Sequence, residues 1–188
     1  EVTGIDFSER AIAHAKRLAS EMGTPARFIQ TDLYDLPSVL PGEFDVVFTS
    51  YGVLGWLPDL ARWGAIVARY LAPGGRFFIA EGHPTMWLFD GEADELRVKY
   101  PYFASPEPLV LPPTVGNYAD PAAVVTKTVY SWPHHLSEVI NALTGAGLRL
   151  DELREYDHVI WRAFPFLVEP SPGRFVMPAA KPRIPLMY

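Results

Sequence analysis

Cysteine is absent from the 188-residue sequence. Its absence excludes a disulfide framework, a thiolate nucleophile and a Cys-ligated zinc site, and it agrees with a reducing compartment. The sequence also lacks any apolar run long enough to span a membrane. We therefore expect a cytoplasmic protein that makes no contact with a membrane.

Clusters of Lys and Arg are lacking as well. The chain has 16 basic and 22 acidic residues, for a net charge of -6. A protein that binds nucleic acid usually presents a basic surface to the phosphates, so we expect no nucleic acid partner. A small molecule or another protein fits this charge better, and the oligomeric state stays open.

Proline, in contrast, is abundant and unevenly placed. The chain has 19 prolines, about twice the usual share of roughly 5%. Six lie between Pro101 and Pro121 and six between Pro165 and Pro185. The regular stretch from Glu1 to Pro84 should therefore be the scaffold of one domain spanning residues 1–188, with residues 85–132 as an insertion or substrate cover.

Short apolar strands alternate with amphipathic helices in the scaffold. Strands are expected at residues 1–6, 27–31, 44–50 and 76–81, and helices after Ser8 and after Asp59, the second ended by Pro73-Gly74-Gly75. A strand that is apolar almost throughout suits a sheet covered on both faces. This order predicts an α/β fold with a doubly wound, mostly parallel sheet.

The pattern is less regular after Thr85. Short strands are possible at residues 96–100 and 124–132, and a helix is expected at residues 136–146, ended by Gly147. Residues 148–156 should form a strand, and residues 182–188 could begin a last one.

Two of the scaffold strands end in a carboxylate. Asp6 ends the first strand and Asp32 follows the second. Ligands of such sheets bind at the carboxyl ends of the strands. One carboxylate could accept hydrogen bonds from both hydroxyls of a ribose, and the other from the amino group of adenine. Together they predict a nucleoside site.

Four segments then match a known family in order and spacing. They are Val-Thr-Gly-Ile-Asp-Phe-Ser, Gln-Thr-Asp-Leu-Tyr-Asp-Leu-Pro, Phe-Asp-Val-Val-Phe-Thr-Ser-Tyr-Gly-Val-Leu and Leu-Ala-Pro-Gly-Gly-Arg-Phe-Phe-Ile. They resemble the second to fifth strand motifs of class I S-adenosylmethionine-dependent methyltransferases. The late helix and Ala-Gly-Leu-Arg-Leu resemble the C-terminal part of the same Rossmann-like enzymes.

The resemblance implies S-adenosylmethionine as cofactor and methyl transfer to an unidentified acceptor, such as a small molecule. By position it implies Asp6 on the ribose, Phe7 beside the adenosine, Asp32 and Leu33 at the adenine, and Ser50 or Tyr51 near the methionine portion. The family's first strand and glycine-rich loop have no counterpart, so we expect the printed chain to begin after them.

Methyl transfer needs alignment of donor and acceptor more than a nucleophile, so no catalytic residue is fixed by the sequence. His83, just past the fifth strand motif, is a candidate general base. Tyr51 and Trp56 could present aromatic faces to a sulfonium cation. His134-His135 suggests helix entry more than metal binding, because adjacent histidines point in different directions.

The aromatic residues of the Pro-rich region leave two interpretations open. They could wall a substrate pocket or only pack the insertion onto the sheet. These residues are Trp87, Phe89, Tyr100, Tyr102 and Phe103.

Two other functions remain as alternatives. A nicotinamide-dependent oxidoreductase also uses an acid after its second strand for the ribose, although no Tyr-x-x-x-Lys set is present. A non-catalytic methyltransferase-like binding subunit would agree with the lack of a glycine-rich loop.

Overall fold

The computed structural model describes residues 2–49, 51–103, 106–115, 122 and 124–188. The chain begins with strand β1 (Val2–Asp6), helix α1 (Glu9–Glu21) and strand β2 (Ala26–Gln30). The Ser8 side chain accepts a hydrogen bond from the Ala11 N–H and so caps α1. The helix returns the chain so that β2 pairs parallel to β1, with Asp6 opposite Gln30.

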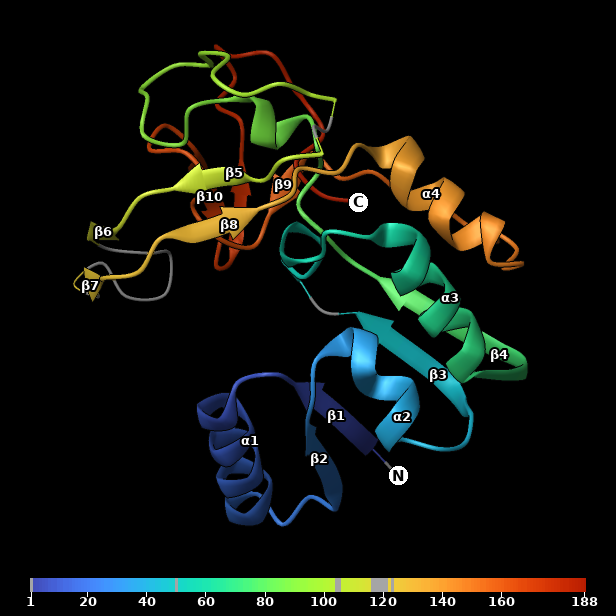
Figure 1. Cartoon of the computed structure of the whole chain (residues 1–188). Coiled ribbons are helices and arrows are strands. Elements are labelled where there is room, and N and C mark those ends of the chain that lie inside the picture. The colour runs from blue at the N-terminus through green and yellow to red at the C-terminus, as the bar shows by residue number, and fades with distance from the viewer. Residues whose placement is uncertain (1, 50, 104–105, 116–121, 123) are drawn as a thin grey trace.

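A second strand pair follows, built from β3 (Phe44–Thr49), helix α3 (Leu60–Tyr70) and β4 (Leu71–Ile79). β3 and β4 are parallel, with Phe48 opposite Phe78. Between β2 and α3 lie three short helical segments: η1 (Leu33–Asp35), α2 (Leu36–Val39) and η2 (Leu54–Trp56). Figure 1 shows β1, not β2, on the side that faces β3.

Helix α3 matches its prediction. Asp59 caps it by accepting a hydrogen bond from the Arg62 N–H at 2.9 Å. Its expected apolar face is the buried one, comprising Leu60, Trp63, Ile66, Val67 and Tyr70. Trp63 lies edge-on to Phe77 of β4, with ring centroids 5.7 Å apart. α3 therefore covers one face of the β3–β4 pair.

The Pro73-Gly74-Gly75 triplet does not end α3, because the helix ends at Tyr70 and the triplet lies within β4. The pairing of β3 with β4 shifts register between Phe44 and Val46. A Cβ on Gly75 would come within 3.0 Å of the Asp45 carbonyl oxygen. The triplet therefore lets β4 approach β3 closely where the ladder is irregular.

Helix α4 (Leu136–Gly145) packs against α3 (Figure 1). The expected helix is thus confirmed, and Gly147 follows it with φ of +90°, a conformation that glycine adopts without strain. Val139 of α4 joins a core with Leu54, Leu57, Trp63 and Tyr188.

The rest of the chain forms short antiparallel pairs. Strand β5 (Leu109–Leu111) pairs with β8 (Val129–Ser131), and β6 (Thr114–Val115) pairs with β7 (Val124–Val125). A three-stranded sheet has the order β10 (Val168–Ser171), β11 (Arg174–Val176), β9 (His158–Val159). The short helical segment η3 (Met86–Leu88) comes before all of these strands in the sequence. Their core contains Met86, Val159, Phe164, Leu167 and Leu186.

Two expected strands are wrong over most of their length. Residues 96–100 contribute only a bridge from Val98 to Phe89. In residues 148–156 the charges pair locally, Arg149 with Asp151 and Arg154 with Glu152, and only Tyr156 forms a bridge, to Met187. The alternation of apolar and polar residues gives no information about whether a partner strand is within reach. Residues 182–188 likewise supply bridges at Met187 but no strand.

None of the helices formed by the described residues is long and apolar enough to cross a membrane.

Candidate functional site

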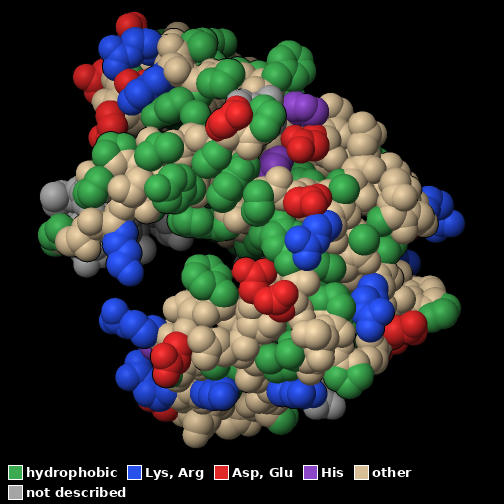
Figure 2. Space-filling model, viewed as in Figure 1, with side chains coloured by type: hydrophobic (Ala, Val, Ile, Leu, Met, Phe, Trp, Pro, Cys, Tyr) green, Lys and Arg blue, Asp and Glu red, His purple; other side chains and the backbone are tan. Residues whose placement is uncertain are grey.

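The carboxyl ends of β1 and β2 bring two predicted site residues to the same edge. The backbone oxygen of Asp6 accepts a hydrogen bond from the Thr31 N–H at 3.0 Å, so Asp32 follows directly beside it. Both carboxylates are exposed. Figure 2 shows acidic side chains on the rim of a hollow that separates the β1–β2 region from the β5–β8 region.

Each carboxylate is oriented by its own turn. Asp6 Oδ1 accepts a hydrogen bond from the Ser8 N–H at 2.7 Å, and Asp32 Oδ1 accepts one from the Tyr34 N–H at 2.8 Å. A local bond of this kind fixes the side chain of an Asp at the start of a helix. The second oxygen of each carboxylate has no partner among the described contacts and remains available to a ligand.

The apolar residues next to these acids differ in exposure. Phe7 is 72% exposed, so its ring is accessible to a ligand. Leu33 is half-buried and packs against the core residues around Leu36 and Tyr70. The exposed Phe7 ring and the two carboxylates thus lie at neighbouring strand ends.

The turn after β3 carries the remaining predicted cofactor contacts. Ser50 lies outside the described residues, and Tyr51 is 49% exposed. Gly52 follows with φ of +76°, which favours glycine. Trp56, at the end of η2, is 56% exposed. The turn therefore presents two aromatic side chains to solvent.

Glu81 is a residue of this region that the sequence analysis missed. It follows β4, is only 5% exposed, and its carboxylate accepts hydrogen bonds from the N–H groups of Gly52, Val53 and Leu54. Burial raises the pKa of Glu81, and the three N–H groups oppose that rise. A signal was present in the sequence, because Glu81 is a lone acid at the end of an apolar strand, as Asp6 is.

His83, the candidate general base, is buried, with one ring nitrogen hydrogen-bonded and the other close to a carboxylate. Nδ1 accepts a hydrogen bond from the Thr85 N–H at 3.1 Å, and Nε2 lies 2.9 Å from the Glu155 carboxylate. Since Nδ1 is an acceptor, the proton is on Nε2. Burial lowers the pKa of His83, although Glu155 acts in the opposite direction. The Tyr188 ring lies edge-on to the His83 ring at 5.8 Å and helps to hold it in place.

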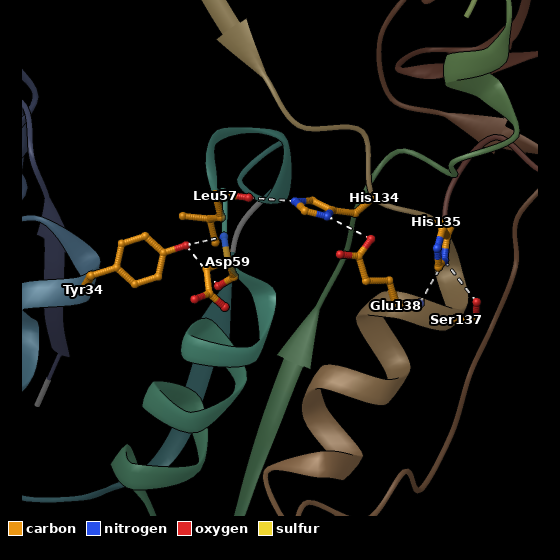
Figure 3. Close-up of polar contacts among 7 residues, drawn as sticks. All are labelled: Tyr34, Leu57, Asp59, His134, His135, Ser137 and Glu138. Atoms are coloured by element: carbon orange, nitrogen blue, oxygen red, sulfur yellow. Dashed lines mark hydrogen bonds and ion pairs between the residues drawn. The ribbon is translucent and has the colours of Figure 1, made fainter. Parts of the chain in front are cut away.

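The adjacent histidines act at the entry of α4, as expected (Figure 3). His135 caps the helix, its Nδ1 accepting a hydrogen bond from the Glu138 N–H. His134 Nε2 donates to the Leu57 carbonyl oxygen at 2.7 Å, and its Nδ1 lies 3.1 Å from Glu138. His134 therefore connects α4 to the end of the β3 turn.

Tyr34 fixes the opposite side of this turn (Figure 3). Its hydroxyl donates to the Asp59 carbonyl oxygen and accepts from the Asp59 N–H, both at 3.0 Å. Burial raises the pKa of Tyr34, so the hydroxyl keeps its proton. The segment between η2 and α3 is thus attached on two sides.

Aromatic residues of the Pro-rich region pack mainly against the C-terminal part of the chain. Trp87 stacks on Trp161 and Phe89 lies edge-on to Phe164. Tyr102 stacks on the His135 ring. Trp87 still exposes 51% and Phe103 71% of their surface, so packing accounts for only part of this aromatic set.

The β5–β8 arm is connected to the β3 turn. The Trp132 N–H donates to the Gly55 carbonyl oxygen at 2.9 Å. A Cβ on Gly55 would lie 3.3 Å from the Ser131 hydroxyl. The arm is therefore placed beside the turn that carries Tyr51 and Trp56.

Residues 1–75 match a methyltransferase domain. The chain is 33% identical over 90 residues to a ubiquinone biosynthesis O-methyltransferase of Dechloromonas aromatica, covering 47% of this chain and 38% of the relative. It is 36% identical over 84 residues to a demethylmenaquinone methyltransferase of Thermus thermophilus, covering 45% of this chain and 37% of the relative. Less than two fifths of each relative's length is therefore matched.

Solved structures extend the similarity of fold over the whole chain. An S-adenosylmethionine-dependent methyltransferase from Listeria monocytogenes matches 100% of this chain and 76% of its own, with a TM-score of 0.61 and 20% identity. One from Mesorhizobium loti matches 83% of this chain and 67% of its own, with a TM-score of 0.55 and 23% identity. The chain therefore has the Rossmann-like α/β fold seen in these structures.

Proposed function

We propose that this protein is a class I S-adenosylmethionine-dependent methyltransferase, which binds S-adenosylmethionine and transfers its methyl group to a small-molecule acceptor; the match of residues 1–75 to a methyltransferase domain supports the proposal. The observation that carries the proposal is the pair of exposed carboxylates, Asp6 and Asp32, side by side at the ends of two parallel strands. Ligands of open α/β sheets bind at this edge.

When bound, S-adenosylmethionine supplies a methyl group that is already activated on a sulfonium sulfur. Asp6 accepts hydrogen bonds from the ribose hydroxyls through the oxygen that Ser8 does not occupy. Asp32 and Leu33 contact the adenine, and Phe7 lies along the adenosine. Ser50 or Tyr51 would lie near the methionine portion, where an aromatic ring such as that of Tyr51 stabilises a cation.

The acceptor is proposed from the names of the relatives. One is named as an O-methyltransferase of ubiquinone biosynthesis and the other as a demethylmenaquinone methyltransferase. A small ring compound with an apolar body would suit the exposed aromatic rings of Trp56 and Trp87. Residues 85–132 would cover it, and no nucleic acid would take part.

His83 remains the candidate general base for the acceptor. To receive a proton at Nδ1, His83 would first have to release the hydrogen bond that this nitrogen now accepts from the Thr85 N–H. A His83→Gln variant that loses kcat by about 100-fold or more with unchanged cofactor affinity would support this role. An unchanged kcat would reject it.

The two parallel strand pairs are proposed as parts of one doubly wound sheet within a single domain spanning residues 1–188. Val46, Phe48 and Phe78, each more than half exposed, share the face of β3–β4 opposite α3. A second helical layer on that face, as in doubly wound folds, would bury them.

Equilibrium binding of labelled S-adenosylmethionine to the native protein tests the function. Saturable binding, followed by transfer of label to a phenolic or quinol acceptor, is the expected result. Binding of NAD in its place would favour the oxidoreductase alternative. Absence of both would favour a non-catalytic binding subunit.

A further inference from the structure

The turn that follows β3 has no capping side chain of its own. Val53 occupies the N-cap position of η2 but makes no side-chain hydrogen bond to it. The first N–H groups of a helical turn need acceptors from elsewhere. Here they are the N–H groups of Gly52, Val53 and Leu54, and all three point at one carboxylate.

That carboxylate belongs to Glu81, about 30 residues further along the chain. Oε2 accepts from the Gly52 N–H at 2.8 Å, and Oε1 accepts from Val53 at 2.8 Å and Leu54 at 3.2 Å. A carboxylate has two acceptor oxygens and no donor, so it can satisfy all three groups at once. The positive φ of Gly52 gives the turn the conformation in which its N–H meets Oε2.

The backbone of Glu81 is fixed from the other side. Its N–H donates to the Tyr188 carbonyl oxygen at 2.9 Å, and its own carbonyl oxygen accepts from the Tyr188 N–H at 3.0 Å. Tyr188 is itself buried in the core that contains Leu54 and Leu57. The carboxylate therefore cannot move without the C-terminal segment or the turn moving too.

An ionised side chain is a costly way to hold a turn. Burial of the charge opposes ionisation of Glu81 and raises its pKa. A neutral acceptor would cap part of the turn without that cost. The carboxylate in return satisfies all three N–H groups and so fixes the turn more completely than a neutral acceptor would.

We propose that Glu81 is a positioning residue for the methyl transfer reaction, in that it fixes the 52–54 backbone and thereby places Tyr51 and Trp56 at the rim of the site. The inference rests on the proposed function, because the aromatic rings matter only where a cofactor and an acceptor bind beside them. Glu81 touches neither ligand itself. It acts through the turn.

The test uses Glu81→Gln in the native protein. The amide keeps an oxygen for Val53 and Leu54 but turns an NH2 group toward the Gly52 N–H. Hydrogen exchange at Gly52 should accelerate about tenfold or more, the size expected for loss of a hydrogen bond to a charged group. S-adenosylmethionine affinity should fall by a similar factor. Glu95→Gln, the same change at an exposed site, should alter neither.

Outcomes separate this inference from the proposed function. If the wild-type protein binds no S-adenosylmethionine, the function fails, and the exchange rates still decide whether Glu81 holds the turn. If the wild type binds and Glu81→Gln binds equally well, the positioning role is wrong. Unchanged exchange at Gly52 would also overturn it.

Glu81→Asp serves as the second variant if Glu81→Gln does not fold. It keeps the charge on a side chain one methylene shorter, which cannot reach all three N–H groups. Intermediate exchange and intermediate affinity are expected. Wild-type values for both would contradict the inference.

Discussion

At the scale of single residues, polar side chains of the site divide into two kinds. Glu81, His83 and His134 are enclosed, and their polar contacts reach elements distant in sequence. Asp6 and Asp32 are exposed and bond only to their own turns. The first kind holds the shape of the site, and the second is free to bind a ligand.

Replacing Asp6 should weaken binding of S-adenosylmethionine. Asp6→Ala removes the proposed acceptor of the ribose hydroxyls, and we expect a loss of about 1–3 kcal/mol, the range for hydrogen bonds to a charged group. Asp6→Asn keeps an acceptor for the Ser8 N–H and separates loss of the cap from loss of the charge. Titration calorimetry provides the measurement.

Asp35→Ala is the matched control for Asp6. Asp35 is also exposed and follows the same strand end as Asp32, but no ligand contact is proposed for it. Its replacement should leave the affinity unchanged. Equal losses in Asp6→Ala and Asp35→Ala would point to general electrostatics and would argue against a ribose contact.

Glu81 should also give the protein a particular pH dependence. Its pKa in the folded state is raised, so between the unfolded and folded pKa values only the folded state holds the proton. Its contribution to the free energy of unfolding is then fully present below the unfolded pKa and is lost as pH rises through the folded one. The loss is about 1.4 kcal/mol for each pH unit of that interval.

The difference in unfolding free energy between wild type and Glu81→Gln measures this contribution, since other groups cancel. As the pH is raised from about 4 toward neutrality, the wild type should lose unfolding free energy relative to Glu81→Gln. Urea denaturation at a series of pH values checks it. A difference that moves toward the wild type with rising pH would mean that the carboxylate is stabilised in its charged form, opposite to the effect of burial.

Asp6 and Asp32 could be predicted because a strand end followed by an acid is a local pattern. Glu81 shows the same local pattern, but its partners are N–H groups about 30 positions earlier. Backbone donors are present in every residue, so the sequence does not mark which of them a carboxylate will meet. The contact of His134 with the Leu57 carbonyl oxygen could not be predicted either, because every residue has a backbone carbonyl.

At the scale of elements, helices were predicted better than strands. α1, α3 and α4 have caps and apolar faces that are encoded within their own residues. Strands need a partner, and the β9–β10–β11 sheet joins three short segments whose pairing no local pattern specifies. The expected strand at residues 148–156 does not form because these residues pair with no neighbouring strand in the described part of the chain, apart from the bridge of Tyr156 to Met187.

The contact between α3 and α4 depends on Gly64. A Cβ at this position would lie 2.4 Å from the Ala142 carbonyl oxygen, which real structures do not allow. Gly64→Ala should destabilise the protein by about 1–3 kcal/mol through overpacking, in spite of the roughly 1 kcal/mol that Ala gains in helix propensity. Chemical denaturation measures the change.

Gly145→Ala is the control for Gly64. Gly145 ends α4, and a Cβ there would meet nothing within 4 Å. We expect it to be neutral or to stabilise by up to about 1 kcal/mol. If both substitutions stabilise, the two helices can separate without cost, and the close approach is not needed for packing.

At the scale of the whole molecule, the proposed cofactor contacts lie in the first third of the chain, whereas the turn after β3 depends on Tyr188. Glu81 bonds to the turn through its carboxylate and to Tyr188 through its backbone. His134 attaches α4 to the same turn. A ligand bound at Asp6 and Asp32 should therefore stabilise more than the elements that it touches.

Thermal unfolding with and without S-adenosylmethionine tests this coupling together with the proposal of one domain. A ligand at 100 times its Kd that binds only the folded chain adds about 2.7 kcal/mol, which for a chain of this size raises Tm by roughly 5–11 °C. If residues 1–188 unfold as one unit, probes in both halves, such as the fluorescence of Trp63 and of Trp161, should shift by the same amount. A shift confined to the Trp63 probe would divide the chain into two units, because the ligand would then stabilise only the part that holds its carboxylates.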